Sequence, residues 1–102
     1  MIARIWNGKT RLTHKEAYID FMKSRALPDY QKTNGFVKLE FLCQTVGDIV
    51  NFKLITFWEN LEVIQNFAGE DYEKAKYYPE DDGFLLDFPE KVEHYEVFAS
   101  KE

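Results

Sequence analysis

The stretch Lys53–Gly69, KLITFWENLEVIQNFAG, decides the fold because a strand in it passes directly into a helix. Asn60 is a preferred residue before the first turn of a helix, and Gly69 suits the left-handed position that follows the last turn. The strand therefore ends at Trp58, whose indole is expected at the corner between strand and helix. In open α/β folds such a corner often forms the rim of a pocket.

The residues before this corner predict an antiparallel hairpin. Phe36–Val46 and Ile49–Trp58 both alternate in hydropathy, and the two residues between them are Gly47 and Asp48. Glycine supplies the positive φ that two-residue hairpin turns require. Cys43 lies in the apolar alternation of the first of these strands, so we expect a buried and chemically inert thiol there.

The N-terminal third predicts a strand followed by a helix. Residues 2–9 alternate as a strand. Thr13 and Glu16 have the spacing of a capping box, and the apolar positions behind them follow a helical period. Pro28 should end this helix near Ala26. Residues 29–35 are polar and are expected to form a loop.

The C-terminal third predicts less regular structure. A short helix is expected over residues 71–76, and a last strand over Val92–Ala99. Between them, Pro79–Gly83 contains three consecutive carboxylates. Because these lack the spacing of a calcium-binding loop, a solvated turn is the favoured interpretation over a metal site.

The order of elements predicts one α+β domain over residues 1–102. Strand, helix, strand, strand, helix, strand is the ferredoxin-like βαββαβ sandwich, in which a four-stranded antiparallel sheet carries both helices on one face. The opposite face contains large aromatic side chains, so a homodimer that packs sheet against sheet would cover it. The residues expected on that face are Arg4, Trp6, Lys38, Glu40, Ile55, Phe57, Tyr95 and Val97.

The composition limits the partners. Nine Phe, six Tyr and two Trp make 17% of the chain, which predicts an aromatic pocket, an oligomer interface or both. A net charge of −5 without clustered basic residues argues against nucleic acid. Cys43 is the single cysteine, and a reducing compartment is expected. Because no signal peptide and no membrane span is predicted, the expected location is the cytoplasm.

Three stretches together resemble the antibiotic biosynthesis monooxygenase family, whose members are dimeric α/β-barrel proteins of about this length. They are the opening MIARIW at residues 1–6; TFWE at 56–59 with Ile64 and FAG at 67–69; and YYPED at 77–81 with HYEV at 94–97. The resemblance implies a homodimer with one pocket per subunit, between the sheet and the helices. It also implies oxygenation of phenols or quinols by dioxygen, with no metal or flavin cofactor.

Some members of this family degrade heme, and the sequence resembles them at one position. They carry an Asn near the end of the first strand, as Asn7 does here. They also use a Trp in the second helix and a His ten residues later, and these positions are most naturally Phe67 and Tyr77 in this chain. Because the axial ligand is absent, heme degradation is not expected.

The candidate catalytic residues are Asn7, Trp58 and His94. Asn7 would bind a substrate carbonyl or phenolate, or else pair with backbone at a strand end. Trp58 would stack on the ring, or else pack in the core. His94 would act as a general base, because its pKa lies near neutrality, or else be structural. The candidate substrate-binding residues are Ile5, Phe21, Phe67, Tyr77 and Tyr78.

Two functions remain open. The first is a homodimeric, cofactor-independent monooxygenase that acts on a small aromatic phenol or quinol. The second is a non-catalytic dimeric module that binds a small aromatic or apolar molecule. The sequence shows no metal-ligand set, no phosphate-binding glycine loop and no spacing typical of a catalytic triad.

Overall fold

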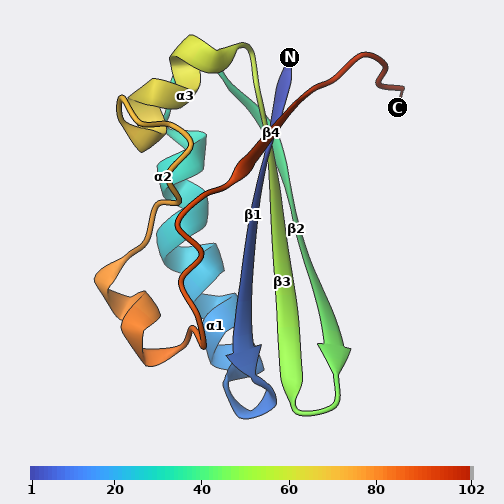
Figure 1. The fold of residues 1–102 in the computed structure, drawn as a ribbon, viewed down its shortest axis with the longest axis vertical. Coiled ribbons are helices and arrows are strands. Elements are labelled where there is room, and N and C mark those ends of the chain that lie inside the picture. The colour runs from blue at the N-terminus through green and yellow to red at the C-terminus, as the bar shows by residue number, and fades with distance from the viewer. Residues whose placement is uncertain (102) are drawn as a thin grey trace.

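A computed structural model describes residues 1–101 and confirms the predicted α+β sandwich. Four antiparallel strands form one sheet in the order β2-β3-β1-β4, with the helices on one side (Figure 1). The strands are β1 Ile2–Arg11, β2 Phe36–Val46, β3 Ile49–Trp58 and β4 Glu93–Glu96. The first and last strands pair as expected, although β4 is only half as long as predicted.

The turn and the cap that were predicted around β3 are both present. Gly47 has a φ of +60° in the β2–β3 turn. Helix α3, Leu61–Ala68, begins at Asn60, whose side chain accepts a hydrogen bond from the Val63 N–H at 3.0 Å. Gly69, with a φ of +90°, ends the helix. Local backbone chemistry therefore sets the corner where β3 passes into α3.

The first helix is longer than predicted, because Pro28 does not stop it. The rod runs through η1 Leu12–His14, α1 Lys15–Phe21, the π-helical turn η2 Met22–Ala26 and α2 Leu27–Gln31. In η2 the Leu27 N–H bonds Met22 O, five residues back. Pro28 then occupies the first turn of α2, where a missing N–H costs little. The predicted capping box does not form, since no side chain caps the start of α1.

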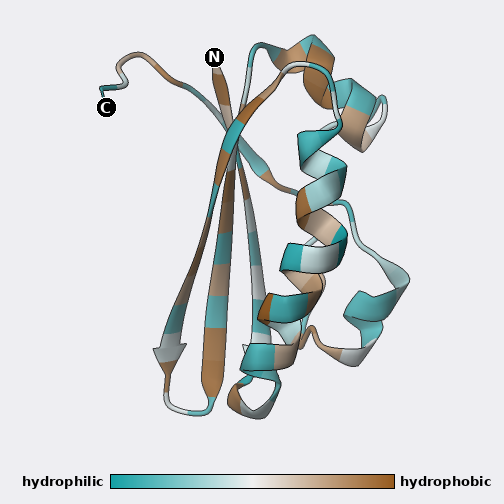
Figure 2. Ribbon diagram, turned by 180° about the vertical axis from the view of Figure 1, so that it is seen from behind, coloured by the Kyte–Doolittle hydropathy of each residue, from teal (hydrophilic) through white to brown (hydrophobic). Residues whose placement is uncertain are grey.

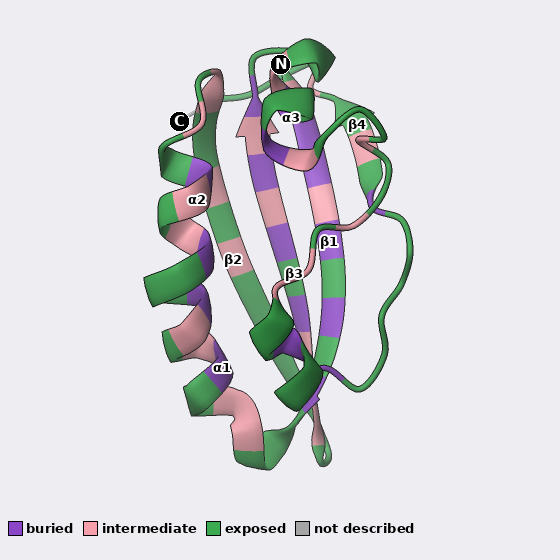
Figure 3. Ribbon diagram, turned by 90° about the vertical axis from the view of Figure 1, so that its left-hand side faces the viewer, coloured by how far each residue is buried: buried purple, intermediate pink, exposed green. Residues whose placement is uncertain are grey.

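The segment between α3 and β4 also differs from the prediction. Residues 71–76 are not helical, and Lys74 instead forms an isolated antiparallel bridge with Lys91. Pro79–Gly83 is a 3-10 turn, η3. Its Asp81 is buried, whereas a solvated carboxylate was expected. This long segment covers the β1–β4 side of the sheet, beside the rod of α1, η2 and α2 (Figure 3).

The two faces of the sheet differ sharply in burial. Apolar and polar residues alternate along the strands (Figure 2), and buried positions alternate with intermediate or exposed ones along most of β1 and β3 (Figure 3). We call the covered side the helix face and the other side the open face. The core on the helix face includes Val50, Phe52, Leu54, Trp58, Tyr18, Ile64 and Phe67.

The sequence prediction placed Arg4 and Trp6 on the wrong face. In the register Trp6 pairs with Leu54 and Arg4 pairs with Thr56, so both side chains lie on the helix face and are buried. Lys38, Glu40, Ile55, Phe57 and Tyr95 lie on the open face as predicted. The prediction for Cys43 is also wrong. Its thiol is exposed, because β2 is an edge strand that the helices only partly cover.

Candidate functional site

An aromatic chamber lies between the sheet and the helices. Its cavity has a volume of about 10 Å³, which is about the room of one water molecule. Strand, rod and the segment before β4 all contribute to its wall, so residues far apart in the sequence meet here. The lining residues are Trp6, Tyr18, Met22, Ala26, Tyr30, Leu54, Lys76, Tyr78 and Asp81.

Asp81 and Tyr18 form a buried hydrogen-bonded pair in this wall. Tyr18 Oη donates to Asp81 Oδ1 at 3.0 Å, and the Tyr78 N–H donates to Asp81 Oδ2 at 2.7 Å. Burial raises the pKa of Asp81 despite these donors. Burial, with the neighbouring carboxylate, raises the pKa of Tyr18 well above its usual value of 10. The pair thus places a phenol that keeps its proton next to a carboxylate that is more basic than usual.

A second tyrosine–aspartate pair closes the chamber on the outside. Tyr78 Oη donates to Asp29 Oδ2 at 2.7 Å, and Lys32 Nζ lies 3.0 Å from Asp29 Oδ1. The hydrogen bond from Tyr78 lowers the pKa of Asp29. The Arg25 guanidinium lies 4.8 Å from the centroid of the Tyr78 ring. These contacts fix η3 and the residues before it to the helical rod.

Lys76 brings a positive charge to the aromatic wall. Its Nζ lies 4.1 Å from the centroid of Phe67 and 5.8 Å from that of Tyr78, which is cation–π geometry. Burial lowers the pKa of the ammonium group. Phe67 in turn stacks on Tyr30 with a centroid distance of 4.4 Å. An anionic ring in the chamber would therefore meet a cation and aromatic faces.

Trp6 contributes a buried donor. Its indole Nε1 has no partner within hydrogen-bonding geometry in residues 1–101, although the Trp6 side chain acts on the neighbouring Tyr77, whose pKa is raised by burial and lowered by Trp6. Buried polar groups are nearly always paired, so a guest molecule that reached this N–H would give it a partner. The ring of Tyr77 packs edge-on against Trp6 at 6.2 Å.

The buried Arg4 and the partly buried His94 form a separate cluster at the β1–β4 edge. Arg4 donates through Nη1 to Tyr72 O and through Nη2 to Lys74 O, the latter at 3.1 Å. Nη1 also lies 3.0 Å from His94 Nε2. Because a guanidinium can only donate, Nε2 accepts and the imidazole is neutral. Burial first, and then Arg4, lower the pKa of His94.

The structure separates the three residues predicted to be catalytic. Trp58 is fully buried in the core, where its Nε1 donates to Thr56 Oγ1 at 2.9 Å. His94 is engaged by Arg4 outside the chamber wall. Asn7 pairs in register with Lys53 and projects from the open face. None of the three lines the chamber, and their catalytic roles stay predictions.

The predicted substrate-binding residues are placed more consistently. Tyr78 lines the chamber, and Phe67 stacks on its Tyr30. Phe21 contacts Tyr18 and Tyr78 from behind, and Tyr77 covers Trp6. Only Ile5 lies elsewhere, on the open face opposite Ile55.

Sequence reasoning missed Tyr18, Asp81, Lys76 and the N–H of Trp6. One signal was available for Asp81. It stands three residues after Tyr78, with Pro79 at the first position of the turn, and that is the spacing at which an acidic side chain reaches back to cap a helical turn. Such a carboxylate is oriented inward by its own backbone contact. Tyr18 and Lys76 had no distinguishing pattern, since their meeting depends on tertiary packing alone.

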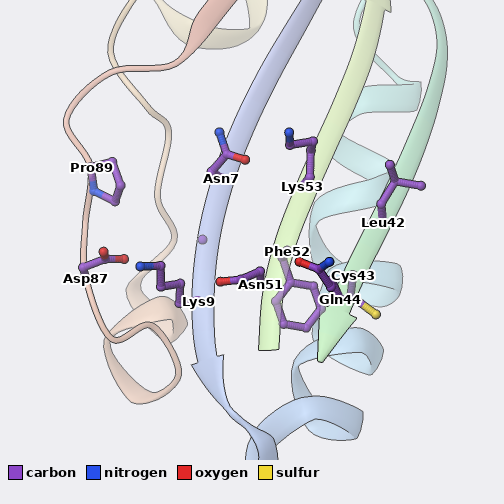
Figure 4. A pocket seen from close by; sticks show the side chains of 11 residues that line it. Asn7, Lys9, Leu42, Cys43, Gln44, Asn51, Phe52, Lys53, Asp87 and Pro89 are labelled. Atoms are coloured by element: carbon purple, nitrogen blue, oxygen red, sulfur yellow. The ribbon is translucent and has the colours of Figure 1, made fainter. Parts of the chain in front are cut away.

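A second, larger hollow lies on the open face near the β2–β3 turn. Its volume is about 530 Å³, and Figure 4 shows its lining residues. We call it the open-face hollow and define it by Asn7, Gly8, Lys9, Leu42, Cys43, Gln44, Asn51, Phe52, Lys53, Asp87 and Pro89. Asn7 therefore lines a site, although not the one beneath the helices.

Within residues 1–101 the structure contains no helix long and apolar enough to cross a membrane. The same residues contain no group of three or more His, Cys, Asp or Glu side chains that could hold a metal ion.

Comparison with known proteins gives structural neighbours only. No family model matches the chain, and no curated protein matches it. A candidate antibiotic biosynthesis monooxygenase from Nitrosomonas europaea superposes with a TM-score of 0.69 at 14% identity, over 97% of this chain and 100% of that one.

Two further solved structures carry ligands. The monooxygenase from the gene ActVA-Orf6 of Streptomyces coelicolor, in complex with nanaomycin D, superposes with a TM-score of 0.61 at 13% identity, over 99% of this chain and 89% of that one. The heme degrader MhuD from Mycobacterium tuberculosis, with two hemes in its active site, superposes with a TM-score of 0.63 at 15% sequence identity, over 100% of both chains. At these identities the likeness concerns architecture. The chain has the ferredoxin-like α+β fold of the antibiotic biosynthesis monooxygenases.

Proposed function

We propose that this protein is a cofactor-independent monooxygenase that acts on a small phenol or quinol bound in the aromatic chamber. The fold supports the proposal, because its neighbours include monooxygenases. The observation that carries it is the buried Tyr18–Asp81 pair beside the unpaired N–H of Trp6. A proton acceptor and a free donor then share one aromatic pocket from which water is excluded.

The reaction needs a phenolate, since the anion gives an electron to dioxygen more readily than the phenol does. A simple phenol plus dioxygen yields a quinone plus water. One oxygen atom enters the ring, the other leaves as water, and the substrate supplies all the electrons. The substrate hydroxyl would pass its proton to Tyr18 Oη while Tyr18 passes its own to Asp81 Oδ1, a step favoured by the raised pKa of Asp81.

Two groups would then stabilise the phenolate. The Lys76 ammonium supplies positive charge at the wall, and the Trp6 N–H supplies a hydrogen bond. Both interactions strengthen as charge develops on the substrate oxygen in a region of low dielectric constant. The stacked rings of Tyr30 and Phe67 would hold the aromatic plane.

Binding requires the chamber to widen. Ligand pockets usually measure about 300–1,000 Å³, far more than the present cavity. The moving part would be the segment between α3 and β4, which carries Lys76, Tyr78 and Asp81 and has only one short helical turn. Its closure over the substrate would exclude water from the reaction.

The test is oxygen uptake by the purified, metal-stripped protein with a panel of hydroquinones, anthrones and flavonols. Asp81→Asn should lower uptake by roughly 10²-fold or more, because the proton acceptor is lost. Asp82→Asn is the matched control, since Asp82 is the exposed neighbour on the same turn. Equal activity of the two variants, or an equal loss in both, would refute the assigned role of Asp81.

The separation of Asn7, Trp58 and His94 favours a second candidate, a non-catalytic module that binds a small apolar molecule. A protein of this kind would show saturable quenching of tryptophan fluorescence by members of the same panel, without oxygen uptake above the autoxidation rate. Because Trp6→Phe removes one of the two tryptophans, binding to this variant is measured by calorimetry, and it should weaken if the guest uses the indole donor.

We also propose that two copies pack their open faces together through the apolar half beside β4, which leaves the half near the β2–β3 turn uncovered. Near β4 this face carries the half-buried side chains of Ile5, Ile55 and Phe57, together with Tyr95, which is 51% exposed. An apolar patch of this kind is typical of an interface. Light scattering should give a dimer, and Phe57→Glu should dissociate it. A monomer at micromolar concentration would contradict the proposal.

A further inference from the structure

The open face is divided into an apolar half and a polar half. Close to β4 the register aligns Ile5 with Ile55. Towards the β2–β3 turn, two consecutive rows cross three strands and are almost entirely polar. One row is Asn7, Lys53 and Leu42, and the other is Lys9, Asn51 and Gln44. Side chains in such rows point the same way, so the six together form one surface.

The chain turns this surface into a hollow by building a wall beside it. Strand β4 pairs with β1 only as far as Ile5. Beyond that point the edge of β1 is followed by the segment that contains Asp87 and Pro89, and the Leu86 N–H donates to Lys9 O at 2.9 Å. Figure 4 shows Asp87 and Pro89 on one side of the polar rows and Leu42 on the other. The half-open hollow has a volume of about 530 Å³, which falls within the size range of ligand pockets.

The polar groups in the hollow have no internal partners. Within residues 1–101, no hydrogen bond and no ion pair involves the side chain of Asn7, Lys9, Gln44, Asn51 or Lys53. In Figure 4 the side chains of Lys9 and Asp87 are directed toward one another, but they do not form an ion pair. Two ammonium groups and three amides thus face one carboxylate. The hollow is locally positive in a chain of net charge −5.

We propose that the open-face hollow binds a small organic anion that carries a carboxylate or phosphate group together with hydroxyl groups. Lys9 and Lys53 would bind the anionic group as point charges. The amides of Asn7, Asn51 and Gln44 can both donate and accept, which suits hydroxyls. The site lies on the open face and is separated by the sheet from the aromatic chamber.

The experiment is a titration of the ¹⁵N-labelled protein, as purified, followed by amide chemical shifts. Citrate, glucose 6-phosphate and uncharged glucose are the probes, so the carboxylate and phosphate sources are tested separately. At least one anion should saturate, and its shifts should centre on residues 7–9, 42–44 and 51–53. Glucose alone should give none. Added sodium chloride should weaken binding, because the attraction is electrostatic.

Variants assign the binding to the hollow. Lys53→Met and Lys9→Met should each raise the dissociation constant about tenfold, since each removes one charge-assisted contact. Lys38→Met is the matched control. Lys38 lies on the same face, but over the ring of Phe57 and outside the hollow. The absence of saturation with both anions, shifts centred elsewhere, or an equal effect of Lys38→Met would overturn the proposal.

Discussion

Gly8→Ala should destabilise the protein through one contact, although glycine-to-alanine changes in strands usually stabilise. A Cβ atom at residue 8 would stand 2.2 Å from Trp6 Cη2, 2.8 Å from Cζ3 and 2.9 Å from Cζ2. Ordinary contact begins at 3.4 Å, so the indole would have to move by about 1.2 Å. That ring is buried, and Tyr77 packs against it, so it has little room to move.

The magnitude follows from two opposing terms. Restricting the unfolded chain stabilises by about 0.4–1 kcal/mol, whereas overpacking a core costs about 1–3 kcal/mol. The net loss is about 1–2 kcal/mol, or roughly 5–15 °C in melting temperature for a domain of this size. Urea unfolding followed by circular dichroism measures the free energy directly.

Gly83→Ala is the matched control. A Cβ atom there meets nothing within 4 Å, and its φ is not positive, so its stability should be equal to the wild type or slightly higher. In a Trp6→Leu background the cost of Gly8→Ala should vanish, which gives a coupling of about 1–2 kcal/mol. A free energy of unfolding for Gly8→Ala equal to that of Gly83→Ala, or a cost of Gly8→Ala that persists in the Trp6→Leu background, would show that the contact with the indole is not the cause.

Three further predictions concern neighbouring elements. Burial and Arg4 lower the pKa of His94 below 6.5, so the unfolded state binds more protons than the folded state does. The contribution of His94 to stability is therefore complete above pH 6.5, and it is lost as the pH falls through the lowered pKa. His94→Gln should flatten this dependence in urea midpoints measured between about pH 5 and 7. Asn60→Ala should cost about 1 kcal/mol in thermal melts through loss of the cap on α3, whereas Asn60→Ser should stay near the wild type. Trp58→Phe should lower the free energy of unfolding by about 1–3 kcal/mol, because the hydrogen bond to Thr56 is lost and a gap is left in the core. Oxygen uptake per folded molecule should stay unchanged, and a selective loss of uptake would show that Trp58 is catalytic.

The fold was predictable where local chemistry determines the structure. Gly47 permits the positive φ of a two-residue turn between two alternating strands, and Asn60 and Gly69 mark the two ends of one helix. Hydrophobic alternation then fixes the face of β3, whose buried positions are apolar or small. The failure at Pro28 is physical too. A π-helical turn before Pro28 accommodates the missing N–H, and no pattern in the residues before the proline predicts such a turn.

The site was predictable only in its aromatic lining, because its polar residues depend on contacts across the fold. Arg4 was assigned with Trp6 to the open face of the sheet, because alternation alone does not say which side of β1 the helices cover. Here two backbone carbonyls and His94, all more than sixty residues away, bind it on the helix face. Asp81 was likewise assigned to a solvated turn, although Tyr18 and the Tyr78 N–H hold it inside.

The orientation of Arg4 decides how Asn7 must be interpreted. Side chains alternate along β1, so burying Arg4 and Trp6 on the helix face places Asn7 and Lys9 on the open face. A variant at Asn7 therefore reports on the open-face hollow and not on the aromatic chamber. Asn7→Ala should leave oxygen uptake unchanged while weakening anion binding. If it abolished uptake instead, the reaction would belong to the open face, and the chamber would be part of the core.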